Sequence, residues 1–260
     1  MTQGILLFAH DNEQIQYSLL AAWQARRIHK WLNKPVSIVT DIQSVETLKK
    51  HNLDKEFDQI ILSDAETTQQ KIYTDKLLTF KNVNRIHAYE LTPYDETLVI
   101  DTDIAIQSDR LNLVWNNTED YLVCKHCSDV FDRNWTALKH VHMAGIEFYW
   151  ATLFYFKKTA RAKQFADLCK YIQENYQTYI DEYGITDRYL RNDHVWSMAI
   201  NQLGGAVIPS TLWYGTGNDP ITRMTGDTVS FEQAKIQGQD VHIMHKFSLM
   251  EYVKQELGCE

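Results

Sequence analysis

Short apolar runs alternate with longer amphipathic segments through the first 106 residues of the chain. Apolar runs typical of buried strands lie at 4–9, 36–40, 58–62 and 97–106. Apolar residues at helical spacing predict helices between these strands, at 13–32, 45–52 and 73–91. Strands that alternate with helices predict an α/β fold, in which a parallel sheet is flanked by helices and binds ligands beyond the carboxyl ends of its strands.

The second half of the chain has a more mixed pattern. Its expected elements are a strand at 122–124, a buried aromatic run at 148–156, amphipathic helices at 157–176 and 195–203, and a last strand at 240–245. The turn-rich segment 214–228 contains glycines that permit hinge motion, so we expect it to close over a bound ligand as a lid. Because the chain has no internal repeat, low-complexity run or linker, we predict one domain over residues 1–260.

The composition is that of an ordinary globular protein, with 44% hydrophobic and 23% charged residues. No apolar run approaches the ~18 residues that cross a membrane, and the start of the chain lacks the features of a signal peptide, so we expect a cytoplasmic protein. The cysteines are expected to be reduced, because Cys124 and Cys127 have no second pair to complete a zinc site. A net charge of −8 argues against general binding to nucleic acids.

Asp101 and Asp103 are the strongest candidates for chemistry. They end a short apolar strand and are separated only by Thr102, so both carboxylates can turn toward one hard cation such as Mg²⁺ or Mn²⁺. Such a cation can bridge the phosphates of a nucleotide diphosphate and stabilise the charge that develops when the diphosphate leaves. The simpler alternative is that the two aspartates open a turn after a buried strand.

Four segments of the first half resemble one enzyme family when taken in order. They are Phe8-Ala9-His10-Asp11-Asn12, Tyr17-Ser18-Leu19-Leu20, Ser37-Ile38-Val39-Thr40-Asp41 and Leu98-Val99-Ile100-Asp101-Thr102-Asp103. This order resembles the nucleotide-sugar glycosyltransferases of the A-type fold (GT-A), and in particular family 8, the glycogenin-like enzymes. The resemblance implies a single GT-A-like (Rossmann-like) domain with a mixed sheet flanked by helices. Residues 1–115 would bind the nucleotide sugar, and residues 116–260 the acceptor.

The resemblance also implies roles for individual residues. The donor would be held by Ala9, His10, Asp11, Arg85, Asp101, Thr102, Asp103 and Lys246, and the metal by Asp101, Asp103 and His245. We prefer His245 to His242 as the third metal ligand because strand alternation places it last before the polar exit. The chain lacks the family's Gly-x-x-Lys-Pro-Trp continuation, which leaves this choice open. Asp11 and Arg85 also have plain explanations, as a helix cap and as part of a solvated helix face.

Asp193 is the candidate catalytic residue. It lies at the entry to an amphipathic segment, where the resembling family carries Asp-Gln-Asp-x-x-Asn, and it replaces the family's Gln with a carboxylate. A carboxylate, unlike an amide, could deprotonate an acceptor hydroxyl, so both retention and inversion of the sugar's configuration stay open. The plain explanation for Asp193 is again a helix cap.

These observations predict a metal-dependent glycosyltransferase that moves a sugar from a nucleotide diphosphate donor, with uridine as the expected base. The sequence does not identify the acceptor, which could be a saccharide, a small molecule, a protein or a modified nucleobase. Residues 125–163 hold seven Lys and Arg against three Asp and Glu. This basic stretch is either a solvated face or a surface for an anionic acceptor.

Three alternatives use the same residues differently. A haloacid-dehalogenase-type phosphatase would use Asp101 as nucleophile and Asp103 as acid–base group, but Ala105 stands where that family has Thr or Val. A nucleotidyltransferase of sugar phosphates would need a Gly-rich, Arg-bearing loop after the first strand, and none follows it. A non-catalytic sugar-nucleotide-binding protein would bind its ligand equally well with and without the metal.

Overall fold

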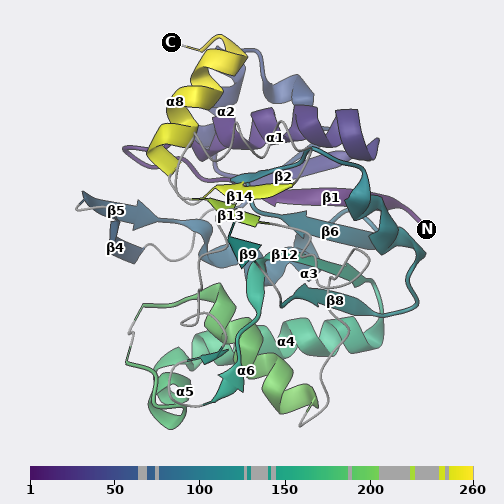
Figure 1. Ribbon diagram of the computed structural model, residues 1–260, viewed down its shortest axis with the longest axis vertical. Coiled ribbons are helices and arrows are strands. Elements are labelled where there is room, and N and C mark those ends of the chain that lie inside the picture. The colour runs from purple at the N-terminus through teal and green to yellow at the C-terminus, as the bar shows by residue number, and fades with distance from the viewer. Residues whose placement is uncertain are drawn as a thin grey trace.

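The computed structural model describes residues 1–63, 69–73, 76–125, 128–129, 140–141, 145–186, 189–204, 223–225, 240–243 and 246–259. A six-stranded sheet with the strand order β3-β2-β1-β6-β12-β8 lies at its centre (Figure 1). These strands are β1 (Gln3–Phe8), β2 (Val36–Thr40), β3 (Gln59–Leu62), β6 (Glu96–Ile100), β8 (Tyr121–Cys124) and β12 (Trp150–Lys157). The first four are parallel, whereas β12 is antiparallel to both of its neighbours. The predicted mixed α/β sheet is therefore confirmed.

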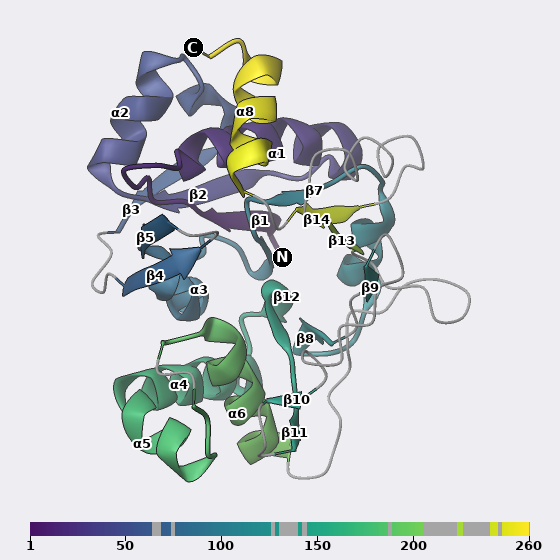
Figure 2. The same ribbon diagram turned by 60° about the vertical axis from the view of Figure 1, so that its left-hand side comes forward.

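Helix α1 (Tyr17–Leu32) packs on one face of this sheet, with α2 (Ile42–Lys50) beside it and α8 (Lys246–Leu257) on its outer side (Figure 2). Every residue from 17 to 25 is buried, because neighbouring elements cover α1 on more than one side. The sequence predicts a helix over 13–32 here, and α8 is absent from the prediction. The cover that α8 provides explains why α1 is apolar over more than one face.

The helices α4 (Ala160–Glu174), α5 (Tyr176–Glu182) and α6 (Asn192–Gly204) lie on the opposite side of the sheet (Figures 1 and 2). Aromatic rings fill the space between these helices and β12. Trp196 of α6 lies 5.1 Å from Phe154 of β12 and 6.0 Å from Phe165 of α4, measured between ring centroids. The aromatic run of the sequence is thus core, as its composition predicts.

A second, smaller sheet joins the end of β6 to the late part of the chain. Its order is β7-β14-β13-β9, with β7 (Ile104–Ala105), β14 (Val241–Ile243), β13 (Arg223–Thr225) and β9 (Ser128–Asp129). β14 runs antiparallel to β7, so that His242 pairs with Ile104. This pairing places residue 242 directly beside the segment that follows Asp103.

The helix predicted at 73–91 is wrong in its first part, and only the residues from 82 to 91 are helical. β4 (Gln69–Tyr73) and β5 (Lys76–Phe80) form an antiparallel hairpin, followed by the 3-10 helix η2 (Asn82–His87) and the short helix α3 (Ala88–Leu91). The two strands carry Ile, Tyr, Thr and Phe, which favour strands. Strand propensity therefore outweighs the loose helical spacing of the apolar residues.

The remaining described elements are short: η1 (Asp54–Glu56), η3 (Arg110–Asn116), and the pair β10 (His140–Val141) and β11 (Ile146–Glu147). The predicted lid at 214–228 lies outside the described residues except for β13. Among the described helices, none combines the length and the apolar character needed to span a membrane. Cys169 and Cys259 are free and buried and Cys124 is buried, whereas Cys127 lies outside the described residues.

Candidate metal and donor site

The turn after β6 places Asp101 and Asp103 at the carboxyl end of the central sheet. The N–H of Asp101 donates to the carbonyl of Thr152 in β12 (2.8 Å), and the Asp101 carbonyl accepts from the N–H of Ile104 (3.1 Å), which closes the turn. The Asp103 carbonyl accepts from Ile243 (2.9 Å), so β14 is fixed to the same turn. Both aspartates are therefore held by backbone bonds to strands on either side.

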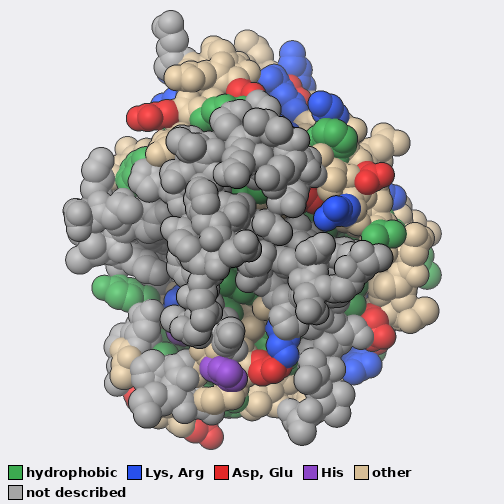
Figure 3. All heavy atoms as spheres, viewed as in Figure 1, with side chains coloured by type: hydrophobic (Ala, Val, Ile, Leu, Met, Phe, Trp, Pro, Cys, Tyr) green, Lys and Arg blue, Asp and Glu red, His purple; other side chains and the backbone are tan. Residues whose placement is uncertain are grey.

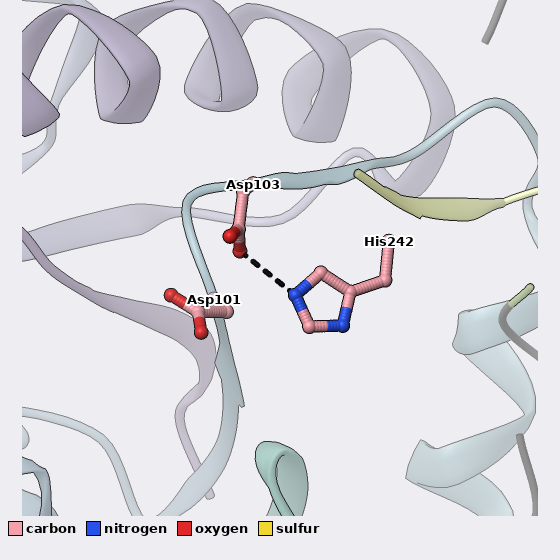
Figure 4. Close-up of side chains that lie close together, drawn as sticks. All are labelled: Asp101, Asp103 and His242. Carbon is pink, nitrogen blue, oxygen red and sulfur yellow. Dashed lines mark ion pairs between the residues drawn. The ribbon is translucent and has the colours of Figure 1, made fainter. Parts of the chain in front are cut away.

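Asp101, Asp103 and His242 form one group, in which a ligand atom from each residue lies within 4.8 Å of the others. Figure 4 shows the two carboxylates and the imidazole around a common space, with His242 Nε2 3.2 Å from Asp103 Oδ1. Asp103 is fully buried, and 14% of the Asp101 side chain is exposed. His245 lies outside the described residues, so the imidazole that the structure places at this group is that of His242.

Two cationic side chains contact the same carboxylates. Arg85 Nη2 lies 2.9 Å from Asp101 Oδ1, and Arg85 Nη1 donates to the carbonyl of Ala151 (3.0 Å). Lys246, the first residue of α8, forms an ion pair with Asp103 Oδ2. Arg85 is buried, so the prediction of a solvated helix face does not apply to it.

The ion pair sets the charge state of Asp103 and Lys246. Burial alone would raise the pKa of Asp103, but the ammonium of Lys246 and the imidazole of His242 hold this pKa well below its usual range. Burial alone would lower the pKa of Lys246, but the carboxylate of Asp103 raises it above its ordinary value. Asp103 is therefore ionised and Lys246 protonated across the physiological pH range.

The donor set fits a divalent cation. Two carboxylates and one imidazole are ligands that Mn²⁺ accepts, and Mg²⁺ would accept the carboxylates. The observation that supports the fit is geometric, since the imidazole of His242 converges with the two carboxylates although it comes from a distant segment of the sequence. Asp101 and Asp103 would hold the ion with His242, while Thr102 between them is fully buried.

No protein-family model and no curated protein matches the chain. Among solved structures, the chain is similar to the galactosyltransferase LgtC in complex with donor and acceptor sugar analogues. The TM-score is 0.58 at 15% identity, over 98% of this chain and 95% of that chain. It is also similar to the bifunctional glycosyltransferase WbbM, with a TM-score of 0.50 at 13% identity, over 98% of this chain and 49% of that chain. The protein has a GT-A fold. The resemblance to family 8 stays a prediction.

Asp193 is linked to Asp101 of the acidic group through Ala151 and Arg85. Its Oδ1 accepts from the N–H of Ala151 (2.9 Å), and the carbonyl of the same Ala151 accepts from Arg85. Its Oδ2 accepts from Arg191 Nη2 (3.3 Å). The carboxylate of Asp193 thus binds β12, although the residue lies in the first turn of α6.

The first strand of the GT-A sheet ends in Ala9, His10 and Asp11, which are all buried. The carbonyl of Ala9 accepts a hydrogen bond from the Thr40 hydroxyl (2.5 Å), and His10 Nε2 lies 2.8 Å from the carbonyl of Ser63. Asp11 Oδ1 and Oδ2 accept from the N–H and hydroxyl of Ser18 (2.8 and 2.9 Å), near the start of α1. Burial raises the pKa of Asp11 despite these bonds. The N-cap residue of α1 is Gln16, so Asp11 is not the cap itself, but its carboxylate accepts from an N–H in the first turn of the helix.

Asp240 belongs to this arrangement and was missed in the sequence. Its carboxylate accepts from the N–H of Gln107 (2.6 Å) and from the N–H and hydroxyl of Ser108 (both 3.0 Å). It therefore ties the start of β14 to the segment that follows β7 and helps to position His242. Burial raises its pKa to about 6. No local pattern around residue 240 distinguishes it from any aspartate before a strand.

Proposed function

We propose that this protein is a metal-dependent glycosyltransferase that moves a sugar from a nucleotide diphosphate, with uridine as the base, to an acceptor. The observation that supports it is the convergence of Asp101, Asp103 and His242 at the carboxyl end of the sheet of a GT-A fold. A divalent cation bound by these residues would neutralise the diphosphate and stabilise the charge that it gains as it leaves.

Arg85 and Lys246 supply the fixed positive charge that a diphosphate needs. Both cations lie on the carboxylates of the metal group, so their side chains border the space that the phosphates would occupy. Lys246 begins α8, and the positive pole of that helix adds to the attraction for an anion. In this proposal the end of β1, with Ala9, His10 and Asp11, borders the base.

Asp193 is proposed to act on the acceptor side. Its link to Arg85 through the single residue Ala151 keeps the carboxylate close to the acidic group. Both of its oxygens accept hydrogen bonds, which hold the carboxylate in one orientation. If it acts as the base, the acceptor hydroxyl attacks from the side of the sugar opposite the leaving diphosphate, and configuration is inverted.

The basic stretch 125–163 gives little support to an anionic acceptor. Lys125 lies 2.5 Å from Glu147, and Lys163 lies 2.7 Å from Asp167. On the face shown in Figure 3, described cationic and acidic side chains lie beside each other rather than in patches of one sign. The described cations of this stretch thus match a solvated face.

A thermal-shift screen of nucleotide sugars with and without Mn²⁺ tests the proposal. A ligand that binds only the native state raises the melting temperature. At a ligand concentration of 100 times Kd, it adds about 2.7 kcal/mol to the free energy of unfolding. We expect a uridine diphosphate sugar to raise the melting temperature only when Mn²⁺ is present, and chelator to abolish the effect. If every nucleotide sugar leaves the melting temperature unchanged, the proposal is wrong. A shift that is the same without metal would instead favour a binding protein.

A further inference from the structure

The oxygens of both metal-group carboxylates already lie close to nitrogen atoms of other side chains. Arg85 lies against both oxygens of Asp101, at 2.9 Å from Oδ1 and 3.4 Å from Oδ2. Asp103 Oδ1 faces His242 Nε2 at 3.2 Å, and Asp103 Oδ2 is paired with Lys246. The N–H of Thr102 also donates to Asp101 Oδ1 (3.0 Å).

The formal charge of the site is therefore balanced before a ligand arrives. Two carboxylates face two permanent cations, and the imidazole adds no charge when it is neutral. A divalent cation that enters this group meets the repulsion of two fixed positive charges at close range in a largely buried setting. A diphosphate, which carries several negative charges, would remove that repulsion by pairing with the same two cations.

The two cations differ in how firmly they are held. Arg85 is buried and also donates to the carbonyl of Ala151, so its position is fixed by the backbone of β12. Lys246 is the first residue of α8, 16% of its side chain is exposed, and its ammonium sits on a flexible four-carbon stem. Lys246 is therefore the cation that can turn from Asp103 toward an incoming anion without disturbing the sheet.

We propose that Lys246 is an exchangeable counterion. Its ammonium pairs with Asp103 in the free protein, and it pairs with the donor diphosphate once the donor has bound. Metal binding and donor binding are then coupled, because each removes an obstacle to the other. The protein alone binds the divalent cation weakly, and it binds the metal and the diphosphate together tightly. This inference rests on the function proposed above and adds to it the cause and the sign of the coupling.

The test is a titration with Mn²⁺ followed by electron paramagnetic resonance, first with the metal alone and then with uridine diphosphate present. Lys246→Gln removes the charge, and Lys246→Arg keeps it. Lys254→Gln removes a lysine from the last turn of the same helix and serves as the matched control. With the metal alone, we expect Lys246→Gln to bind Mn²⁺ about tenfold more tightly than the wild type, whereas the other two variants match the wild type.

Uridine diphosphate should tighten Mn²⁺ binding in the wild type by about tenfold or more, and by much less in Lys246→Gln. Binding of Mn²⁺ alone by Lys246→Gln that equals or falls below the wild-type affinity overturns the proposal. If that variant does not unfold cooperatively, the wild-type titration decides: tightening by the nucleotide supports the coupling, and its absence refutes it. A wild type that binds neither Mn²⁺ nor the nucleotide contradicts the proposed function itself, which separates the two failures.

Discussion

The side chain of Asp103 has two roles in the structure. It is a candidate metal ligand, and it is also the fully buried partner of Lys246 and His242. Asp101 offers the same ligand atoms but is partly exposed, and its partner Arg85 has a second acceptor in Ala151. Replacing the two aspartates should therefore have different effects on stability although both weaken metal binding.

We expect Asp103→Asn to lower the free energy of unfolding by about 3 kcal/mol or more, because it leaves the buried ammonium of Lys246 without a counterion. Asp101→Asn should cost clearly less, and both variants should lose metal-dependent donor binding. Urea denaturation measures the first effect, and thermal shift with Mn²⁺ and nucleotide measures the second. Equal stability losses, or donor binding retained in either variant, would contradict this account.

Asp193 can be tested by a pair of substitutions. Asp193→Asn keeps an oxygen that accepts from the N–H of Ala151, so stability should change little, while turnover falls by orders of magnitude if the carboxylate is the base. Asp193→Ala removes the acceptor as well and should lose an additional ~1 kcal/mol of stability. The measurements are steady-state kinetics and thermal unfolding. Preserved turnover in Asp193→Asn ends the catalytic assignment.

At the scale of elements, β1 depends on a close approach between Gly4 and the ring of Tyr94. A Cβ at Gly4 would lie 2.3 Å from the Tyr94 ring, which is too close for any side chain. The ring cannot retreat easily, because the Tyr94 hydroxyl is 2.7 Å from Ser37 Oγ in β2. The start of the segment that leads into β6 is therefore packed directly onto β1.

Gly4→Ala should lower the free energy of unfolding by about 1–3 kcal/mol, as expected for overpacking in a buried site. Gly204→Ala is the matched control, because a Cβ there meets no atom within 4 Å. Chemical denaturation of both variants gives the comparison. A Gly4→Ala protein that is as stable as the Gly204→Ala protein would show that the strands shift to accommodate the methyl group.

The elements that the sequence predicts well are those whose signal is local. Each of the parallel strands is a short apolar run, and the aromatic run at 148–156 is correctly expected to be buried, although its strand β12 is not predicted. The strand β5 is not predicted, because the apolar residues of 73–91 also recur at a loose helical spacing. Helix α8 is not predicted either, because the last expected element ends at residue 245, and the buried residues Leu249, Met250 and Val253 lie beyond it.

The residues of the site also differ in whether a local pattern in the sequence predicts their contacts. Asp101 and Asp103 lie two positions apart at the end of a strand, so the sequence predicts their pairing. Their contact with His242 and Lys246 depends on the pairing of β14 with β7, and no pattern near either strand specifies a partner so far along the chain. Arg85 was predicted by family resemblance, but its carbonyl partner Ala151 depends on tertiary packing.

At the scale of the whole molecule, α8 connects the site to the first helix. Trp23 Nε1 donates to Glu256 (2.8 Å), and the Trp23 ring meets Tyr252 edge to face at 6.3 Å. Lys246 at the other end of the same helix contacts Asp103. One helix therefore both covers α1 and delivers the ammonium to the metal group.

A chain that ends at residue 245 should expose the apolar side of α1 and melt at a clearly lower temperature. Leu249, Met250 and Val253 are buried in α8, and each contributes about 1.5–3 kcal/mol of apolar burial. Dye binding to exposed apolar surface and thermal unfolding measure the loss. Lys246→Gln, which keeps the helix, controls for the missing charge. A truncated chain with the same melting temperature as Lys246→Gln would show that α8 adds little to stability.

The pairing of Lys246 with Asp103 spans 143 positions of the sequence. Contacts of such separation require a large part of the chain to be brought together before they can form, so they tend to arise late in folding. The strands β1, β2 and β6 need no residue from the last quarter of the chain. During refolding, secondary structure should therefore recover before the capacity to bind Mn²⁺. Recovery of Mn²⁺ binding therefore reports the final step of folding, in which the distant segment that carries His242 and Lys246 packs against the sheet that has already formed.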